Sequence, residues 1–355
     1  MERISLLGMN ASELATLMEA WGQPRYRGMQ LFRWLYHRRA REFSAMTDLP
    51  ASLRERLAEA AEIVWPRVVR RDRSALDGTT KYLLELADGE RIESVLLYDE
   101  DRLTLCISSQ VGCLQGCTFC ATALLGLRRN MTAGEIVGQY LVVEEEIGVG
   151  TITNLVFMGM GEPLANYPQV VRAIELLSDP QGIGLSQRRM TVSTSGLVPA
   201  IERLATSGLR VGLALSLNAT TDAVRDRLIP SNRRYKISGV LAACRRWAQA
   251  TGQPVTIEYV LLEGVNDTDK DAVRLARLAR SLPAKVNLIP YNEVMGLPWR
   301  RPDAARVARF QQALRERGVL ATVRKTKGRD IAAACGQLRA SDPSSASVEL
   351  SSVGS

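Results

Sequence analysis

Hydrophobic residues first recur at helical spacing and then change to alternation, so the chain begins with two different kinds of structure. The helical period covers three segments, 9–19, 26–41 and 52–63. The dipeptide Trp65-Pro66 then ends the helical pattern. From Thr80 the period becomes two, with a turn at Asp88-Gly89 between the alternating runs. These patterns predict a helical accessory domain over 1–75 and a β-hairpin extension over 76–102.

From residue 103 onward, strand-like and helix-like segments alternate. The predicted strands are 103–108, 153–158, 189–194, 211–217, 255–261, 285–289 and 320–325. The predicted helices between them include 132–147, 167–177, 237–250, 269–282 and 302–317. Repeated βα units predict an α/β fold with a parallel sheet, either doubly wound or a barrel. Six or seven units favour a partial barrel over 103–338, and the Ser-rich stretch 339–355 is predicted to be a disordered tail.

Composition and charge narrow the class of protein. Of 355 residues, 46% are hydrophobic and 24% are charged, which predicts a substantial core and excludes disorder for most of the chain. No apolar stretch is long enough to cross a membrane, and no secretory signal is visible, so we expect a cytoplasmic protein without membrane contact. The net charge of +8 suits a polyanionic partner.

Histidine is nearly absent, whereas cysteine is concentrated in one place. His37 is the only histidine, so a His-rich zinc site is excluded and imidazole chemistry would depend on that single residue. Three of the six cysteines form a C-x3-C-x2-C array at Cys113, Cys117 and Cys120, directly after the first strand of the alternating region. Active sites collect in such loops at the carboxyl ends of parallel strands.

Three thiolates at this spacing can hold one face of a four-iron cluster and leave the fourth iron open to a reactive ligand. Two other interpretations are a zinc site completed by a distant cysteine and a group of buried thiols. Zinc sites usually show paired C-x2-C elements, and the chain has no second pair. The array therefore favours an open iron–sulfur cluster.

The array and its surroundings resemble a known family. The array alone resembles that of radical S-adenosylmethionine (radical SAM) enzymes. Three further motifs carry the resemblance to the bacterial dual-specificity rRNA/tRNA adenine C2-methyltransferases, the RlmN family: Gly159-Met160-Gly161-Glu162-Pro163-Leu164, Val192-Ser193-Thr194-Ser195-Gly196 and Asp330-Ile331-Ala332-Ala333-Ala334-Cys335-Gly336-Gln337-Leu338. The similarity extends over nearly the whole chain to Leu338. It implies a partial (β/α)6-type radical-SAM barrel.

The resemblance also implies a role for each candidate site residue. The cluster ligands would be Cys113, Cys117 and Cys120 of one 4Fe-4S cluster. The contacts to S-adenosylmethionine would be Gly161, Glu162, Ser193, Ser216, Leu217, Asn218 and Asn292. Many relatives have His where this chain has Asn218, so a backbone contact is the safer expectation there. The catalytic residues would be Glu93, Cys106 and Cys335.

Each catalytic assignment has a plainer alternative. Cys335, flanked by alanines and glycine, could be a small buried residue; by resemblance it is the methyl-carrying cysteine. Cys106 could be core packing on its strand; by resemblance it is the thiol that helps to release the product, and a disulfide bond is among the expected features. Glu93 would ordinarily be a solvated carboxylate; by resemblance it accepts the C2 proton.

The implied reaction is methylation of adenine C2 in 23S rRNA, at the peptidyl transferase centre, and in tRNA, at the adenosine 3′ to the anticodon. By resemblance, Cys335 takes a methyl group from one S-adenosylmethionine and a second molecule supplies the radical, which makes two per turnover. An electron donor such as flavodoxin is the implied partner, and we expect a monomer. An arginine-rich helical segment, 25–41, with interleaved aromatic residues suits RNA.

Two rival functions stay open at this point. The related C8 methyltransferase, Cfr, shares the cysteines but modifies a different carbon; Gly161-Glu162-Pro163-Leu164 and Arg324-Lys325-Thr326 favour the C2 enzyme by resemblance. A non-catalytic RNA-binding protein with a structural cluster would need neither an open iron nor both Cys106 and Cys335.

Overall fold

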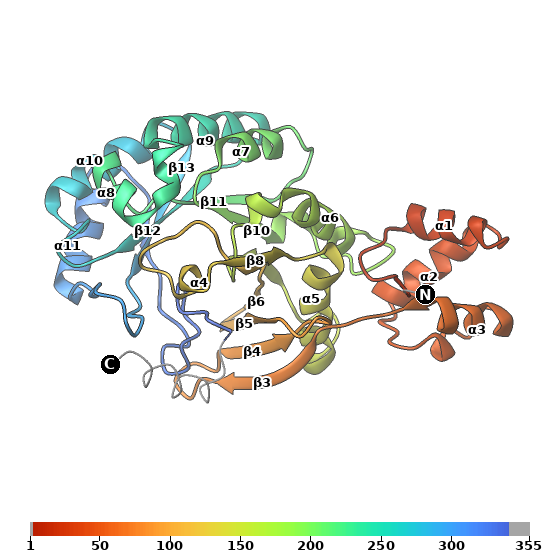
Figure 1. The fold of residues 1–355 in the computed structure, drawn as a ribbon. Helices are drawn as coiled ribbons and strands as arrows, with labels where there is room; N and C mark the ends of the chain where they lie inside the picture. Colours follow the sequence, from red (N-terminus) through yellow and green to blue (C-terminus); the bar gives the residue numbers. More distant parts are fainter. Residues whose placement is uncertain (1–2, 341–355) are drawn as a thin grey trace, which may run out of the picture.

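A ten-stranded mixed sheet forms the body of the protein (Figure 1). The computed structural model describes residues 3–340. Seven neighbouring strands are parallel: β6 (Arg102–Cys106), β9 (Asn154–Phe157), β10 (Met190–Thr194), β11 (Gly212–Ser216), β12 (Val255–Leu261), β13 (Ala284–Pro290) and β14 (Ala321–Val323). They follow chain order across the sheet. Each of these strands lies within about three residues of a predicted one, because short apolar runs between helical patterns mark buried parallel strands.

Helices connect the parallel strands, as expected for βα units. They are α5 (Ala133–Ile147), α6 (Tyr167–Ser178), α7 (Val198–Ala205), α8 (Asp222–Leu228), α9 (Ile237–Thr251), α10 (Asp269–Ala279) and α11 (Ala304–Arg315). Figure 1 shows α7, α9, α10 and α11 along one side of the sheet. The sheet ends at β14 and β3 without closing, so the prediction of an α/β partial barrel is confirmed. Across residues 3–340, no helix has the length and apolar character needed to cross a membrane.

Three antiparallel strands extend the sheet beyond β6. The predicted hairpin is present as β4 (Thr80–Glu85) and β5 (Arg91–Asp99). Outside it lies β3 (Arg67–Arg73), a strand within the range that the sequence predicted to be helical. Its sequence, Arg-Val-Val-Arg-Arg-Asp-Arg, is dominated by charge rather than by a clean apolar alternation. Such composition is typical of an edge strand, which has a neighbour on one side only.

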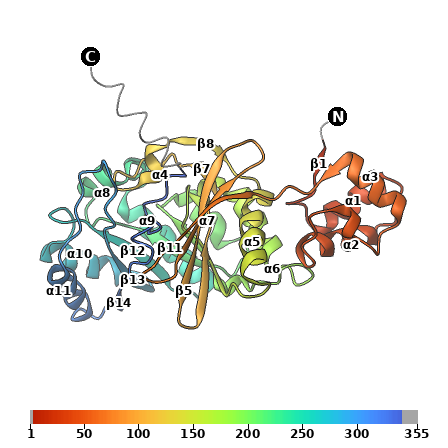
Figure 2. The same ribbon diagram turned by 90° about the horizontal axis from the view of Figure 1, so that it is seen from below.

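Residues 3–62 form a separate helical unit, set to one side of the barrel in Figure 2. It contains α1 (Ala11–Ala20), α2 (Tyr26–Tyr36), α3 (Ala51–Ala60) and the short pair β1 (Ile4–Ser5) and β2 (Ala61–Glu62). Helix α2 crosses α1 at Gly28, where a Cβ atom would lie 2.3 Å from the Ala15 nitrogen. The helix predicted over 26–41 ends earlier, at Tyr36, and Arg39 follows with a left-handed φ of 57°.

Arginines of the predicted RNA-facing segment attach this unit to α5. Arg39 forms a buried ion pair with Glu144, whose other oxygen accepts a hydrogen bond from Tyr140 at 2.8 Å. Arg41 pairs with Glu145 of the same helix. The arginine-rich segment is therefore in part an interface between the helical unit and the barrel, because the acidic end of α5 faces it. The exposed Arg38 stacks over Trp34 instead.

After β14 the chain returns to the site as an irregular segment, 324–340. This segment lies against the cysteine loop: Ala121 donates its N–H to the Gly336 carbonyl at 2.7 Å, and the Thr122 hydroxyl donates to the Leu338 carbonyl at 2.8 Å. Of the predicted tail, residues 339 and 340 are described without helix or strand, and 341–355 lie outside the described residues.

Candidate active site

The cysteine array occupies a loop whose two ends are held together by a pair of short strands. The loop starts after the short strand β7 (Gln110–Gly112), which pairs with β8 (Leu127–Asn130). Gly112 has a φ of 77°, and a Cβ atom there would lie 1.8 Å from the Gly126 oxygen. The same oxygen accepts the N–H of Cys113 at 2.8 Å. Only glycine can fit at this point, so the sequence Gly112-Cys113 fixes where the array begins.

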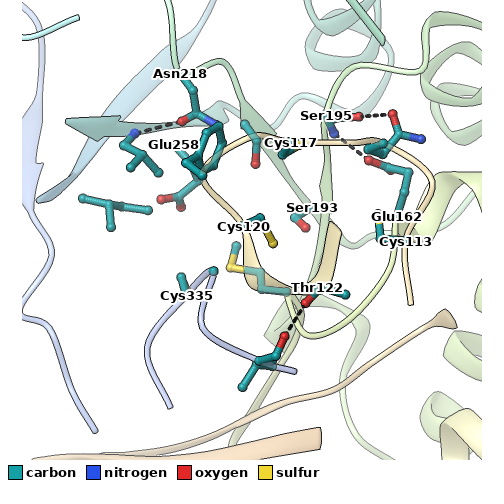
Figure 3. A pocket seen from close by; sticks show the side chains of 18 of the residues that line it. Cys113, Cys117, Cys120, Thr122, Glu162, Ser193, Ser195, Asn218, Glu258 and Cys335 are labelled. Carbon is teal, nitrogen blue, oxygen red and sulfur yellow. Dashed lines mark hydrogen bonds between the residues drawn. The ribbon is translucent and has the colours of Figure 1, made fainter. Parts of the chain in front are cut away.

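All three cysteines of the array line one cavity (Figure 3). Cys120 ends the loop as the residue before the short helix α4 (Ala121–Leu124), and its N–H donates to the Cys117 carbonyl at 3.1 Å. Burial raises the pKa of Cys113 to about 12 and holds the pKa of Cys117 well above its ordinary value. Buried thiols of this kind become good ligands only when a metal compensates the thiolate charge.

The donor set fits an iron–sulfur cluster better than a single ion. The three cysteines are free thiols on one cavity. Within residues 3–340, no group of three His, Cys, Asp or Glu side chains is arranged to hold one metal ion. A four-iron cluster places its thiolate ligands farther apart than the tetrahedral ligands of zinc. Three thiols that line one cavity are the donor set that a four-iron cluster with one open iron requires.

A buried carboxylate faces the same cavity from the end of β9. Glu162 is 4% exposed; it accepts the N–H of Leu164 at 3.1 Å and that of Ser195 at 2.7 Å. Burial raises the pKa of Glu162, and the hydrogen bonds from these N–H groups oppose that shift. Gly161 has a φ of 97°, and a Cβ there would meet Gln110 at 2.6 Å. Glu162 is thus fixed where it could bind an ammonium group.

The other predicted cofactor contacts divide into two groups. Ser193, Ser216, Asn218 and Asn292 line the cavity with Gly161 and Glu162. Leu217 does not line it: this side chain is fully buried in the core, and its N–H donates to the Glu258 carbonyl at 3.0 Å.

Asn218 reaches the cavity through a left-handed turn. Its φ is 55°, a conformation that Asn tolerates better than most residues. The side-chain oxygen accepts the Val260 N–H at 2.8 Å, and the backbone carbonyl accepts from Asn266 at 2.8 Å. Both oxygens therefore have partners within the protein, while the residue still lines the cavity.

A buried arginine, which the sequence analysis did not identify, ties these strand ends together. Arg225 of α8 is fully buried and donates to the carbonyls of Ser195, Ser216 and Leu217 and to the side chain of Asn232. Burial lowers the pKa of Arg225 to about 10. The sequence contains only a weak signal for the role of Arg225, because a single arginine in an amphipathic segment usually lies on the solvated face.

Cys335 lies in the wall between the cluster cavity and a second cavity. The second cavity is lined by Cys106, Cys335 and Arg324, among other residues. The Arg324 guanidinium interacts with the Cys335 thiol, which raises the pKa of Arg324. Burial and the nearby Cys335 raise the pKa of Cys106 to about 12. The structure thus brings the two predicted catalytic cysteines together, both as free thiols.

Two charged residues of this wall were also missed. Arg324 lines both cavities, and Glu258 lines the cluster cavity at 7% exposure. Burial raises the pKa of Glu258, while Arg324 opposes that shift. In the sequence, Arg324 belongs to the motif Arg324-Lys325-Thr326 and Glu258 lies in an apolar strand pattern, so only the tertiary structure shows that they meet.

Glu93 lies apart from both cavities. It is 2% exposed on β5; its carboxylate pairs with Lys81 at 3.2 Å and accepts the Arg339 N–H at 2.8 Å. Glu93 is therefore buried and paired rather than a solvated strand carboxylate. Its connection to the site runs through the segment that carries Cys335, four residues before Arg339.

Two family models match the chain. The radical SAM superfamily model matches residues 107–276, which span the cysteine array and most of the parallel strands. The model of the ribosomal RNA large subunit methyltransferase N-terminal domain matches residues 4–63, which form the helical unit.

Full-length relatives and one solved structure agree with these matches. A dual-specificity RNA methyltransferase RlmN from Anaeromyxobacter dehalogenans is 50% identical over 342 residues, covering 94% of this chain and 91% of the relative. The RlmN of Solidesulfovibrio magneticus is 48% identical, covering 95% and 96% of the two chains. The crystal structure of a radical SAM methyltransferase from Sphaerobacter thermophilus, 48% identical, superposes with a TM-score of 0.91 over 95% of this chain and 100% of that one.

Proposed function

The chain belongs to the RlmN family, a group of radical SAM RNA methyltransferases that use a 4Fe-4S cluster and S-adenosylmethionine, and we propose that it methylates C2 of adenosine through a methyl group carried on Cys335. The proposed substrates are 23S rRNA, at the peptidyl transferase centre, and tRNA, at the adenosine 3′ to the anticodon. The relatives' dual-specificity name and the shared motifs support this choice.

The position of Cys335 carries the proposal. Cys335 lines two cavities: the three array cysteines line the first, and Cys106 lines the second. A group that takes a methyl from one ligand and passes it to another must reach both. Neither a structural cluster nor a plain buried thiol requires that position.

In the cluster cavity, this chain's residues would bind the cluster and orient S-adenosylmethionine. Cys113, Cys117 and Cys120 would hold the cluster, and Glu162 would bind the ammonium group of S-adenosylmethionine. Ser193, Ser216, Asn218 and Asn292 line the rest of the cavity. When bound, the cluster and S-adenosylmethionine supply the methyl group and the radical chemistry that adenine C2, a carbon without a useful acidic proton, requires.

On the substrate side, the thiols and Glu93 would move groups and protons. Arg324 lies against Cys335, which would accept the methyl group through its sulfur by displacement. Cys106 is the neighbouring thiol available to release the product. Glu93 is proposed as the proton acceptor; its carboxylate accepts the Arg339 N–H, on the segment that carries Cys335.

The remaining partners follow from this chemistry. One methyl donor and one radical source make two S-adenosylmethionine molecules per turnover. The cluster needs a one-electron donor such as flavodoxin. The target adenosine must leave its stack, which favours loops and partly assembled RNA. We propose that a single copy of the chain contains the whole site.

The test is an anaerobic assay of cluster-reconstituted protein with S-adenosylmethionine, a chemical reductant and unmodified rRNA fragment or tRNA. Nucleosides are separated and compared with both methyladenosine standards. We expect 2-methyladenosine from the protein and from Cys244→Ala, a matched control because Cys244 is a buried core cysteine on α9. Cys335→Ala should give none.

Three other outcomes would overturn the proposal in different ways. Formation of 8-methyladenosine would move the protein to the C8 branch. Cleavage of S-adenosylmethionine without either product would mean a different substrate. Full activity of Cys335→Ala would contradict the methyl-cysteine step while leaving the family assignment intact.

A further inference from the structure

We infer that a shallow groove beside the cysteine loop is the docking site for an acidic one-electron carrier protein. The groove is lined by Leu114, Gln115, Pro199, Pro230, Arg234 and Tyr235, among others. The inference deepens the proposed function and rests on it, because that function requires a source of single electrons. The structure assigns this source a surface that Cys335 does not line.

The groove shares a wall with the cluster cavity. Gln115, between the first two array cysteines, lines both, and its side-chain oxygen accepts the Ser195 hydroxyl at 3.0 Å. The loop packs on the groove floor at Gly116, where a Cβ would lie 3.5 Å from Pro230. A protein seated in the groove therefore lies directly behind the array. Electron tunnelling falls steeply with distance, so this closeness is what a donor site needs.

The groove is separate from the second cavity, which is lined by the two proposed catalytic thiols. The second cavity meets the cluster cavity at Cys335 and Arg324, and it has no lining residue in common with the groove. An RNA base that reaches Cys335 would thus leave the groove uncovered. Electron delivery and RNA binding can then occur on the same molecule at the same time.

The surface chemistry fits a protein partner. Leu114 is 74% exposed although two cluster cysteines flank it within three residues, and a large apolar side chain exposed at such a position indicates an interaction site. Proline and tyrosine side chains surround it. Electron-transfer encounters bury less than about 1,200 Å², so a small groove is sufficient.

The charge at the rim of the groove indicates the sign of the partner's charge. Arg233 and Arg234 are exposed, and Arg234 stacks on the Tyr235 ring at 5.2 Å. Lys236 is paired with Asp226 at 2.9 Å, and Arg233 also attracts that carboxylate and helps to lower the pKa of Asp226. Arg234, which lines the groove, is in no ion pair within residues 3–340. The net positive charge of this rim, beside an apolar patch, attracts an acidic protein and speeds its encounter. RNA is the other polyanion, but an apolar groove with two cations offers few phosphate contacts.

The step itself is a simple electron transfer. One electron passes from the reduced carrier, for example a flavodoxin in its hydroquinone state, to the oxidised cluster. The carrier is left one electron more oxidised, and no atom changes place between the two proteins.

The test measures cluster reduction by stopped-flow absorbance with reduced flavodoxin as the probe, using cluster-loaded protein without RNA. We expect Arg233→Glu/Arg234→Glu to slow reduction at least tenfold at low ionic strength, because the variant no longer attracts flavodoxin electrostatically. The difference in rate between the variant and the unmodified protein should shrink at high salt. Leu114→Ala should slow cluster reduction by a smaller factor, and this factor should be the same at all salt concentrations. The matched control, Arg277→Glu/Arg280→Glu, makes the same charge change at the carboxyl end of α10 and should leave the rate unchanged.

Two parallel measurements separate this inference from the proposed function. Reduction by dithionite needs no docking, so all variants should reach the same rate and the same yield of methylated adenosine with it. Equal flavodoxin rates in the Arg233→Glu/Arg234→Glu variant and the control would overturn the docking site, as would a loss of RNA affinity in that variant alone. Absence of methylated product from unmodified protein with dithionite would contradict the proposed function instead.

Discussion

Replacement of the buried Arg225 by methionine should destabilise the strand ends that line the cofactor cavity. Arg225 donates to the carbonyls of Ser195, Ser216 and Leu217 and to the side chain of Asn232. Methionine fills much of the same volume but donates no hydrogen bond. Four buried acceptors would therefore lose a partner in one substitution.

The size of the effect follows from two opposing contributions. Four hydrogen bonds from a charged donor, at about 2 kcal/mol each, contribute about 8 kcal/mol. Removal of the guanidinium also removes its desolvation, which lowers the pKa of Arg225 to about 10 and corresponds to about 3 kcal/mol. We expect the free energy of unfolding to fall by about 5 kcal/mol, near the usual loss when one partner of a buried charged network is removed.

Urea denaturation of the cluster-free protein, followed by circular dichroism, measures this loss. The control is Arg246→Met, because Arg246 forms an exposed ion pair with Glu202 and should cost no more than about 1 kcal/mol. S-adenosylmethionine affinity should fall in Arg225→Met and not in the control. A loss below about 1 kcal/mol in Arg225→Met would refute the reasoning.

Three further predictions concern the loop, the thiols and the buried carboxylate. Gly112→Ala should fold but bind little iron after reconstitution, since its Cβ would lie 1.8 Å from the Gly126 oxygen; iron content equal to wild type would contradict this. Alkylation of Cys106 by iodoacetamide should stay slow from pH about 7 to about 9, because only the thiolate reacts and a pKa of about 12 keeps the thiol protonated; mass spectrometry of the labelled peptide checks it. Lys81→Met should lower the free energy of unfolding by about 3 kcal/mol, because Glu93 loses its partner at 3.2 Å, and Lys81→Met/Glu93→Gln should recover most of that loss in the same urea assay.

The parallel sheet and the cysteine loop were predictable because their signals are local. Apolar runs between helical patterns mark the strands of a buried parallel sheet. The array spacing and the glycine before it lie within nine residues, Gly112 to Cys120. Strand β3 was missed for the opposite reason: it lies at an edge, and its arginines hide any alternation.

The charged part of the site was not predictable, because its partners lie far apart in the sequence. Arg225 contacts carbonyls up to 30 residues away, and Arg324 meets Glu258 and Cys106 only after the sheet has formed. A single arginine or glutamate in an amphipathic segment carries no sign of such contacts. The motifs identified by resemblance supplied Cys335 and Glu162, but they gave no reason for the residues that hold them.

The basic segment of the helical unit divides between an internal interface and the surface. The end of the arginine run faces α5, whose last turn contains three consecutive glutamates, 144–146. Arg39 and Arg41 pair with two of these carboxylates. Charge that is neutralised inside the protein contributes little to RNA binding, because phosphate contacts need cations that can release counterions. Arg38, exposed over Trp34, remains available.

The structure also gives the antiparallel extension a purpose that its sequence did not reveal. Cys335 lies on a segment without helix or strand, so something other than the sheet must position it. Asp330 of that segment accepts the Ser74 hydroxyl at 2.7 Å and the Ala75 N–H at 3.0 Å, and Gly328 donates to Asp77 at 2.9 Å. These contacts all come from the turn between β3 and β4. The extension therefore anchors the Cys335 segment together with the cysteine loop, and it helps to hold the proposed methyl-carrying thiol at the wall between the two cavities.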